Sequence, residues 1–391
     1  MTDFPAGFLW GTATAAHQVE GGNWNNDWWA WEHAAATPCE EPSGDAVDHL
    51  WRYPADLDIM RDLGFGAYRF SLEWSRIEPE EGEFSTAALD HYARVIDACH
   101  ARGLQACVTF HHFTTPRWAA ADGGWANPAI VDRFTRFTEV AARRLGPGID
   151  LACTINEPNV VGLMGYLWGL FPPGVTNDLD GYAAASDHFV AAHRAVVPVL
   201  RAAGDFPVGL TVSMSDWSAE PGAEDQIDVW RGPHEDAFLH ATEGDDFIGV
   251  QAYSRTRVGA AGVIGPEPGV EVLPMGYEYW PDATEASIRR AVAVTGLPVY
   301  VTENGIGTDD DTQRIAYLRD SLAGVARTVA DGLDVRGFFH WSLLDNFEWA
   351  FGYRMQFGLV AVDRATQART VKPSATWLAN VIRGGSVASA P

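Results

Sequence analysis

The stretch VYVTENGIG, residues 299–307, runs a strand-like segment into an ionisable side chain. Residues 299–302 are mostly apolar and β-branched, which favours a buried strand, and Glu303 follows at once. The stretch LACTINEPN, residues 151–159, repeats this pattern and closes on Glu157. A buried carboxylate is costly unless it has a partner or a use. Each glutamate alone could cap a loop or pair with an arginine, but two at strand ends indicate a functional site.

On both sides of these stretches, short apolar segments alternate with longer helix-like segments, several of which end at a glycine. Helices are predicted at 48–64, 86–103 and 284–296, among others. Alternation of this kind predicts a parallel sheet. The predicted strands are 8–14, 67–73, 105–111, 151–156, 208–213, 247–252, 299–302 and 337–341.

Eight strands in 391 residues predict an α/β fold of the closed (β/α)8 type, the TIM barrel. An open doubly wound sheet is the alternative, but no GxGxxG motif follows the first strand. Active sites of the barrel lie at the carboxyl ends of its strands, where Glu157 and Glu303 are predicted. We expect one domain over residues 1–391, with a tail of small residues from about residue 384.

The chain is strongly acidic: 27 basic against 52 acidic residues give a net charge of −25. Such a surface repels phosphate groups, which argues against nucleic-acid and membrane partners. The first ten residues lack signal-peptide features, and no run approaches the roughly 20 apolar residues of a membrane span. The four cysteines lack metal-ligand spacing. A cytoplasmic protein with free thiols and no metal is expected, and its oligomeric state stays open.

Five further strand ends or following loops carry polar or aromatic side chains that are out of keeping with a core. Each could have a structural role, as a core residue, a salt bridge or a solvated loop. Of the adjacent His111 and His112, one should face outward, and His112 is the better pocket candidate because it lies nearer the loop. The candidates are His17, Gln18 and Glu20; Arg69; His111 and His112; Gln251 and Tyr253; and Trp341, Glu348 and Trp349.

Together these residues predict a polar pocket with aromatic walls, a composition that suits a sugar. Amide, imidazole and carboxyl groups can pair with ring hydroxyls, and the 16 tryptophans of the chain can supply faces for the C–H side of the ring. Two carboxylates beside such a pocket are what cleavage of a glycosidic bond requires.

The chain resembles glycoside hydrolase family 1, the β-glucosidase family. The resemblance runs from FLWGTATAAHQVEG, residues 8–21, to FGLVAVD, residues 357–363. TINEPN (154–159) is similar to the acid/base motif of the family, VTENG (301–305) to its nucleophile motif, and WSLLDNFEW (341–349) to its sugar-binding loop. All three occur in the expected order.

The resemblance implies a retaining β-glycosidase acting on a small-molecule glycoside, without a metal or an organic cofactor. Glu303 would be the nucleophile and Glu157 the general acid/base, with their carboxyl groups about 5–5.5 Å apart. Arg69 and Tyr253 would hold Glu303 ionised and oriented. The glycone hydroxyls would be bound by Gln18, His112, Asn156, Glu348 and Trp349, with Trp341 as the stacking platform.

Departures from the family pattern concentrate on the leaving-group side. Phe113 and Asn159 stand where many members have tryptophan, and Ala252 replaces an aromatic residue. The chain is short for the family, so some loops should be trimmed. Glu348 favours a neutral sugar over a 6-phosphorylated one, because a carboxylate repels phosphate.

A glucoside is favoured as substrate, with galactosides and fucosides as further possibilities. Three other functions remain as alternatives: a transglycosylase using the same site, a sugar-binding protein without catalysis, and a polysaccharide-degrading barrel of another family. Both carboxylates are present together with Arg69 and Tyr253, which disfavours the non-catalytic alternative.

Overall fold

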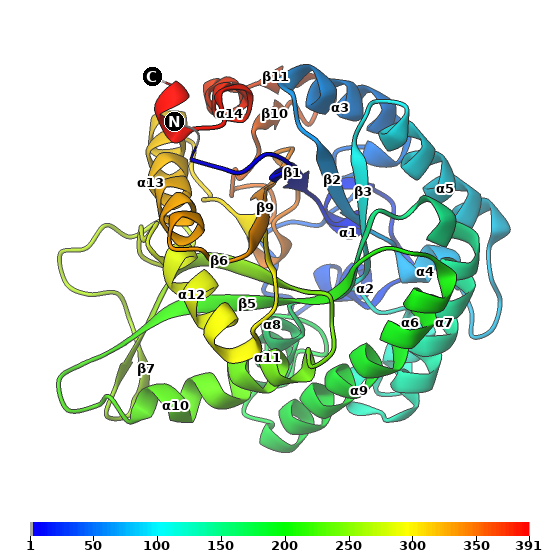
Figure 1. The fold of residues 1–391 in the computed structure, drawn as a ribbon. Coiled ribbons are helices and arrows are strands. Elements are labelled where there is room, and N and C mark those ends of the chain that lie inside the picture. Colours follow the sequence, from blue (N-terminus) through cyan, green and yellow to red (C-terminus); the bar gives the residue numbers. More distant parts are fainter. Residues whose placement is uncertain (1–2, 391) are drawn as a thin grey trace.

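The computed structural model describes residues 3–390, which form a closed barrel of eight parallel strands (Figure 1). Neighbouring strands pair in parallel all around the ring, and β1 closes it by pairing with β9. The predicted (β/α)8 barrel is therefore confirmed. The barrel strands are β1 (Leu9–Ala13), β2 (Ala67–Ser71), β3 (Gln105–His112), β4 (Leu151–Asn156), β5 (Val208–Ala219), β6 (Phe247–Gly259), β8 (Val299–Asn304) and β9 (Val335–Trp341).

Long helices surround the barrel (Figure 1), and local sequence sets several of their ends. The Ser85 side chain accepts a hydrogen bond from the backbone N–H of Ala88 at the start of α5, and Gly64 ends α3 with a φ of 89°. The helices predicted at 48–64, 86–103 and 284–296 are confirmed as α3, α5 and α12. The long helices are α3 (His49–Leu63), α5 (Thr86–His100), α7 (Ala129–Leu145), α9 (Leu179–Ala203), α12 (Ala283–Thr295), α13 (Asp311–Ala330) and α14 (Pro373–Gly384).

Shorter elements occupy the connections and the C-terminal segment. The α-helices among them are α1 (Ala16–Val19), α2 (Asp27–Glu32), α4 (Trp74–Ile77), α6 (Arg117–Ala121), α8 (Pro158–Gly162), α10 (Gln226–Arg231) and α11 (Ala237–Ala241). The π-helices are η3 (Leu163–Leu167) and η4 (Gly232–Asp236), and the 3-10 helices are η1 (Gly124–Ala126), η2 (Gly146–Gly148), η5 (Trp349–Phe351) and η6 (Val387–Ser389). The short strands are β7 (Gly262–Ile264), β10 (Val360–Val362) and β11 (Arg369–Val371).

The two chain ends meet beside α14 (Figure 1). The backbone N–H of Asp3 donates to the carbonyl oxygen of Gly385 at 2.8 Å, and the Asp3 carboxylate accepts from the Ser386 hydroxyl at 2.6 Å. The predicted small-residue tail from about residue 384 thus contains the short helix η6 and is held by the N-terminal segment.

Barrel strands are apolar on both faces because one face packs on helices and the other fills the interior. In β3 every residue after Gln105 is buried. Arg69 in β2 is an exception, since its guanidinium lies fully buried inside the barrel. A buried cation requires compensating partners, and these are found at the site described below.

Strands β5 and β6 continue well beyond the barrel, although only 208–213 and 247–252 were predicted. Past a bulge at Met214–Asp216 the two strands pair again, from Asp216 opposite Arg255 to Ala219 opposite Val258. Strand β7 adds antiparallel to this extension. The prediction followed the apolar run and ended where polar residues begin, because alternation in a half-exposed strand is a weaker pattern. The extension forms one wall of the cavity described below.

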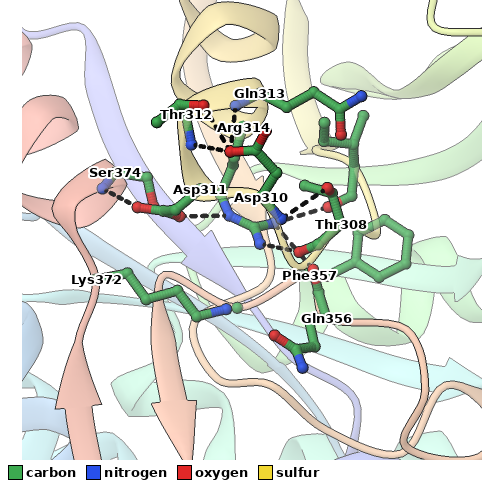
Figure 2. Close-up of polar contacts among 12 residues, drawn as sticks. Thr308, Asp310, Asp311, Thr312, Gln313, Arg314, Gln356, Phe357, Lys372 and Ser374 are labelled. Carbon is green, nitrogen blue, oxygen red and sulfur yellow. Dashed lines mark hydrogen bonds and ion pairs between the residues drawn. The ribbon is translucent and has the colours of Figure 1, made fainter. Parts of the chain in front are cut away.

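Arg314 of α13 joins the loop after β8 to the loop after β9 (Figure 2). Its guanidinium is buried and donates to the carbonyl oxygens of Ile306, Thr308 and Gln356 at 2.8, 2.6 and 3.0 Å. Its Nε donates to the Asp311 carboxylate at 3.0 Å. One side chain thereby satisfies three backbone carbonyls and joins the loop that follows the Glu303 strand to the loop that carries Glu348 and Trp349.

We predict that Arg314→Met lowers the free energy of unfolding by about 3–5 kcal/mol, because it takes the donor from the buried carbonyls of Ile306 and Thr308 and removes the cation that pairs with Asp311. Urea unfolding followed by fluorescence measures the change. Arg319→Met is the matched control: it lies on the same helix, its partner is the adjacent Asp320, and both are exposed. A loss no larger for Arg314→Met than for this control would contradict the assigned role.

Candidate active site

Glu303 lies near the end of β8 and is held by two donors. Its Oε1 accepts from Arg69 Nη1 at 2.6 Å, and its Oε2 accepts from the hydroxyl of Tyr253 at 2.7 Å. Arg69 comes from β2 and Tyr253 from β6, so three strands meet at one carboxylate. Both carboxylate oxygens are engaged in charge-assisted bonds, which favour the ionised form.

Behind Glu303, the next residue anchors the strand end. Asn304 donates from its side-chain amide to the carbonyl oxygen of Ala252 at 2.7 Å and to the Thr284 hydroxyl at 2.9 Å. These bonds tie β8 to β6 and α12. Asn304 therefore helps to fix the direction of the preceding carboxylate.

Glu157 follows β4 directly, where the chain turns into α8. Its backbone has a φ of 41° and a ψ of 57°, the left-handed region that a residue with a side chain rarely adopts. Its backbone N–H donates to the carbonyl oxygen of Thr211 at 3.0 Å, which ties the turn to β5. Strained backbone of this kind concentrates at functional sites. The turn presents the Glu157 side chain to the same cavity as Glu303.

The two carboxyl groups have unlike environments. Burial raises the pKa of Glu157 well above its usual value, and the negative charge of Glu303 raises it further. Burial also raises the pKa of Glu303, but the Arg69 cation and the Tyr253 hydroxyl oppose this effect. Glu303 is therefore the first of the pair to ionise, and Glu157 retains its proton to higher pH. A pair with separated pKa values can supply one acid and one anion at the same pH.

A second polar group connects α1 with the loop after β9. Gln18 donates from Nε2 to Glu348 Oε2 at 3.1 Å, to Asn346 Oδ1 at 3.2 Å and to the carbonyl oxygen of Phe347 at 2.8 Å. Its Oε1 has no protein partner among residues 3–390 and can accept from a ligand. Burial, followed by the charge of Glu303, raises the pKa of Glu348 to about 8. A neutral carboxyl at this position can both donate and accept.

Asn156 is the centre of the network beneath the cavity. Its Oδ1 accepts from Arg69 and from Gln251, the latter at 2.9 Å, while its Nδ2 donates to His112 Nε2 at 3.2 Å. His112 Nε2 is therefore unprotonated and its Nδ1 carries the proton, an assignment that rests on this bonding pattern. Burial lowers the pKa of His112 well below its usual value, so the ring is neutral. Nδ1 has no partner within the described part of the chain.

Aromatic rings line the same region. The ring of His112 stacks over Trp341 with centroids 5.7 Å apart and over Trp349 at 6.1 Å. Phe113 and Trp349 both have positive φ values, 69° and 53°, and their rings pack 5.0 Å apart. The flat faces of Trp341 and Trp349 border the cavity that contains the two glutamates.

The structure therefore places most of the predicted site residues around one cavity of about 680 Å³. Gln18, Asn156 and Arg69 lie behind this first layer and orient it. The residues that line the cavity are His112, Glu157, Tyr253, Glu303, Trp341, Glu348 and Trp349.

Two residues that were expected among the polar strand ends have structural partners instead. His17 contacts Glu32 at 3.3 Å, and Glu20 accepts from Arg76 at 2.8 Å and from the Tyr92 hydroxyl at 2.7 Å. Neither His17 nor Glu20 lines the cavity. Their partners come from α2, α4 and α5, and nothing in the local sequence around residues 17–20 indicates those contacts.

His111 faces away from the cavity, as the alternation of side chains predicts. Its ring packs against Trp125 and Phe134 with centroids 5.0 and 6.0 Å apart. Burial lowers the pKa of His111 to about 3, so the ring is an uncharged part of the outer core. Asn159 is also withdrawn from the cavity, because its amide donates to the carbonyl oxygen of Ser213 at 2.8 Å.

No local sequence pattern predicted the apolar lining of the outer half of the cavity. Apolar side chains from η3, from the loop after it and from β7 line this half; Met164, Phe171 and Val263 are examples. Isolated apolar residues in loops follow no period, so no pattern connects them before the chain folds. Asn346, which orients Gln18, was likewise not predicted as part of the site, whereas Gln251, which orients Asn156, was among the predicted polar strand ends.

Two further observations concern metal binding and membrane spans. Within residues 3–390, no group of three or more His, Cys, Asp or Glu side chains is arranged to hold a metal ion. None of the helices in that range is both long and apolar enough to cross a membrane.

Comparison with known proteins identifies relatives along nearly the full length of the chain. The model of "Glycosyl hydrolase family 1" matches residues 1–243 and 251–386. Beta-glucosidase A of Thermotoga maritima is 32% identical over 441 aligned positions, which cover 98% of each chain. The 1,4-beta-D-glucan glucohydrolase of Thermotoga neapolitana is 33% identical over 99% of this chain and 100% of its own. The solved structure of beta-glycosidase BGL167 is 46% identical, superposes with a TM-score of 0.92 and covers 98% of both chains.

The alignment with the Thermotoga maritima protein has more positions than the 391 residues of this chain, so that relative contains segments that this chain lacks. This agrees with the expectation of trimmed loops.

We predict that Tyr253→Phe raises the pKa of Glu303 by roughly one pH unit, because a hydrogen bond to the ionised form is lost. Titration by ¹³C NMR of protein labelled at the glutamate carboxyl carbon measures this, with Glu303→Gln identifying the resonance. Tyr300 lies on β8, the strand of Glu303, and is not bonded to Glu303, so Tyr300→Phe should leave the titration midpoint of Glu303 unchanged. An unchanged midpoint in Tyr253→Phe would show that the hydroxyl does not support the anion.

Proposed function

Because the chain belongs to glycoside hydrolase family 1, we propose that it is a retaining β-glucosidase that removes terminal, non-reducing β-linked sugars. One observation carries the proposal: two buried carboxyl groups at the ends of β4 and β8 share one cavity, and only Glu303 has a cation to stabilise its negative charge. That asymmetry supplies an acid and a nucleophile side by side, as the reaction needs.

In the first step Glu157 gives its proton to the glycosidic oxygen. The bond between this oxygen and the anomeric carbon breaks, the aglycone leaves as an alcohol, and Glu303 forms a covalent bond to the anomeric carbon. Arg69 and Tyr253 keep Glu303 ionised for the attack. The high pKa of Glu157 keeps its proton available near neutral pH.

In the second step water replaces the enzyme at the anomeric carbon. Formation of the ester removes the negative charge of Glu303, which is one of the causes of the raised pKa of Glu157. The pKa of Glu157 therefore falls, and its carboxylate accepts the proton of the attacking water. The products are the free sugar in its original β configuration and the enzyme with both carboxyl groups restored.

We propose that the sugar ring lies on Trp341 and Trp349 with its hydroxyls toward Gln18, His112 and Glu348. Gln18 Oε1 can accept a bond and His112 Nδ1 can donate one. The raised pKa of Glu348 lets the neutral carboxyl bond in both directions. This region offers a 6-phosphate no unpaired cation, because the guanidinium of Arg69 is already committed to Glu303 and Asn156, which supports a neutral glycone.

Glucosides are the favoured substrates; β-galactosides differ from them only in the configuration at C4, and β-D-fucosides in that configuration and in the absence of the 6-hydroxyl. Transfer of the sugar to an alcohol acceptor in place of water is a second candidate activity, since the outer cavity is open to acceptors other than water. We further propose a cytoplasmic location, because none of the four cysteines forms a disulfide and free thiols suit a reducing compartment.

We predict that Glu303→Ala abolishes turnover of aryl β-D-glucosides and that azide or formate partly restores it, giving a product of inverted configuration. The small anion occupies the place of the missing carboxylate and attacks from the same side. Initial rates on aryl β-D-glucoside, galactoside, fucoside and 6-phosphoglucoside, with the variant as blank, test the proposal as a whole. Full activity in Glu303→Ala would remove this residue from the nucleophile role, and so would the absence of anion rescue.

We predict that Glu157→Gln slows alkyl glucosides by about 10³-fold or more, while 2,4-dinitrophenyl glucoside loses far less in the glycosylation step. An alkoxide needs a proton to depart, whereas a dinitrophenolate departs without one. Pre-steady-state bursts separate this step from hydrolysis of the covalent intermediate. Equal losses on both substrates would contradict the assignment of Glu157 as the acid.

A further inference from the structure

The cavity above Glu157 and Glu303 has an outer half that differs in chemistry from the inner half. Its side walls come from η3 and the loop after it, from β7, and from the segment around Met275. Apolar groups dominate these walls: Leu163, Met164, Trp168, Leu170, Val263 and Met275. An aglycone that extends from Glu157 toward solvent must pass between these walls.

Polar side chains also border the outer half, but they are largely bonded to one another. The Ser254 hydroxyl donates to the carbonyl oxygen of Glu278 at 2.7 Å, and the Thr256 hydroxyl donates to Ser215 at 2.9 Å. Arg255 is held by Glu278 and by Glu267. These bonds occupy the hydroxyl protons of Ser254 and Thr256 and most of the Arg255 guanidinium; Arg257, which also lines the cavity, donates to the carbonyl oxygen of Gly265 at 3.0 Å.

The guanidinium of Arg255 is further occupied by a ring. It lies over the face of Trp280, 3.9 Å from the ring centroid. A cation that is paired with two carboxylates and stacked on an indole is a structural part of the wall. A ligand in the outer half therefore contacts the apolar neighbours of Arg255 more than its charge.

The rim of the cavity exposes large apolar side chains to water. Trp168 is 49% exposed and Val263 is 45% exposed, and both line the cavity. Exposed apolar groups gathered around a cavity mouth are typical of binding surfaces. Near Glu157 the side chain of Asn159 is turned to the carbonyl oxygen of Ser213 and does not line the cavity.

The size of the cavity fits a bulky occupant. Its volume of about 680 Å³ lies within the range of pockets that enclose drug-sized ligands. The polar inner half, around Gln18, His112 and Glu348, accommodates the sugar ring in the proposed function. The remaining space is bordered mainly by carbon atoms.

We propose that the outer half selects glycosides with a bulky apolar aglycone, such as a long alkyl chain or a fused-ring hydrocarbon skeleton, over glycosides whose aglycone is a second sugar. This inference rests on the proposed β-glucosidase function. It separates the chain from a glucan-degrading role, because a glucose unit at this position would face mainly apolar side chains.

The test compares butyl, hexyl and octyl β-D-glucosides, below their micelle concentrations, with cellobiose. The alkyl leaving groups have nearly the same acidity, so chain length alone changes the contact. We expect kcat/KM to rise roughly twofold per methylene, less than the roughly fourfold that full burial would give, and octyl glucoside to exceed cellobiose at least tenfold.

Rates that do not depend on chain length, or cellobiose as the better substrate, would overturn the inference. β-D-glucosyl fluoride separates this failure from failure of the proposed function, because its leaving group does not reach the outer half. Turnover of the fluoride with no alkyl preference would reject only the apolar selection. Absence of fluoride turnover would reject the β-glucosidase function and, with it, this inference.

Two pairs of variants locate the effect. Val263→Thr and Trp168→Ala should lower the ratio of octyl glucoside to cellobiose kcat/KM, by about threefold and tenfold respectively. Val371→Thr and Trp51→Ala are the matched controls, since Val371 is 42% and Trp51 74% exposed and neither lines the cavity. These controls should keep the wild-type ratio. Equal ratios in all four variants would place the alkyl preference outside these walls and overturn the assignment.

Discussion

The ion pair between Arg69 and Glu303 is the interaction on which the rest of the site depends. Both groups are buried inside a barrel made mostly of apolar strands, where an isolated charge of either sign would be costly. The cation offsets the effect of burial on Glu303, and it also holds Asn156, which in turn orients His112. The same guanidinium therefore fixes both the proposed nucleophile and the proposed sugar-binding network.

The fold brings two glutamates to one cavity but places the Arg69 cation against only one of them. Parallel strands deliver their carboxyl ends to one rim, so Glu157 and Glu303 reach a common cavity although 146 positions separate them in the chain. Only Glu303 contacts the cation, whereas Glu157 experiences burial and the repulsion of its partner. In the proposed reaction, this difference in environment lets Glu303 attack as an anion and lets Glu157 act as the acid.

Strain and rigid support accompany this arrangement. Glu157, Phe113 and Trp349 all have positive φ values, each costing on the order of 1 kcal/mol or more, and all three border the cavity. Such conformations persist where the surroundings over-determine them. Arg314 contributes by joining the loops after β8 and β9. The outer walls from η3 and β7 are instead apolar.

The sequence by itself determined the eight strands, the main helices and the two glutamates, because each is encoded by neighbouring residues: an apolar run, a capping residue, a carboxylate at a strand end. It also predicted His112 over His111, from strand alternation and from the position of His112 nearer the loop. Only the tertiary structure decided that Glu20 forms an ion pair with Arg76, how far β5 and β6 extend, and that the outer half of the cavity is apolar. These features arise from contacts between distant segments, and no local pattern records which segments will meet.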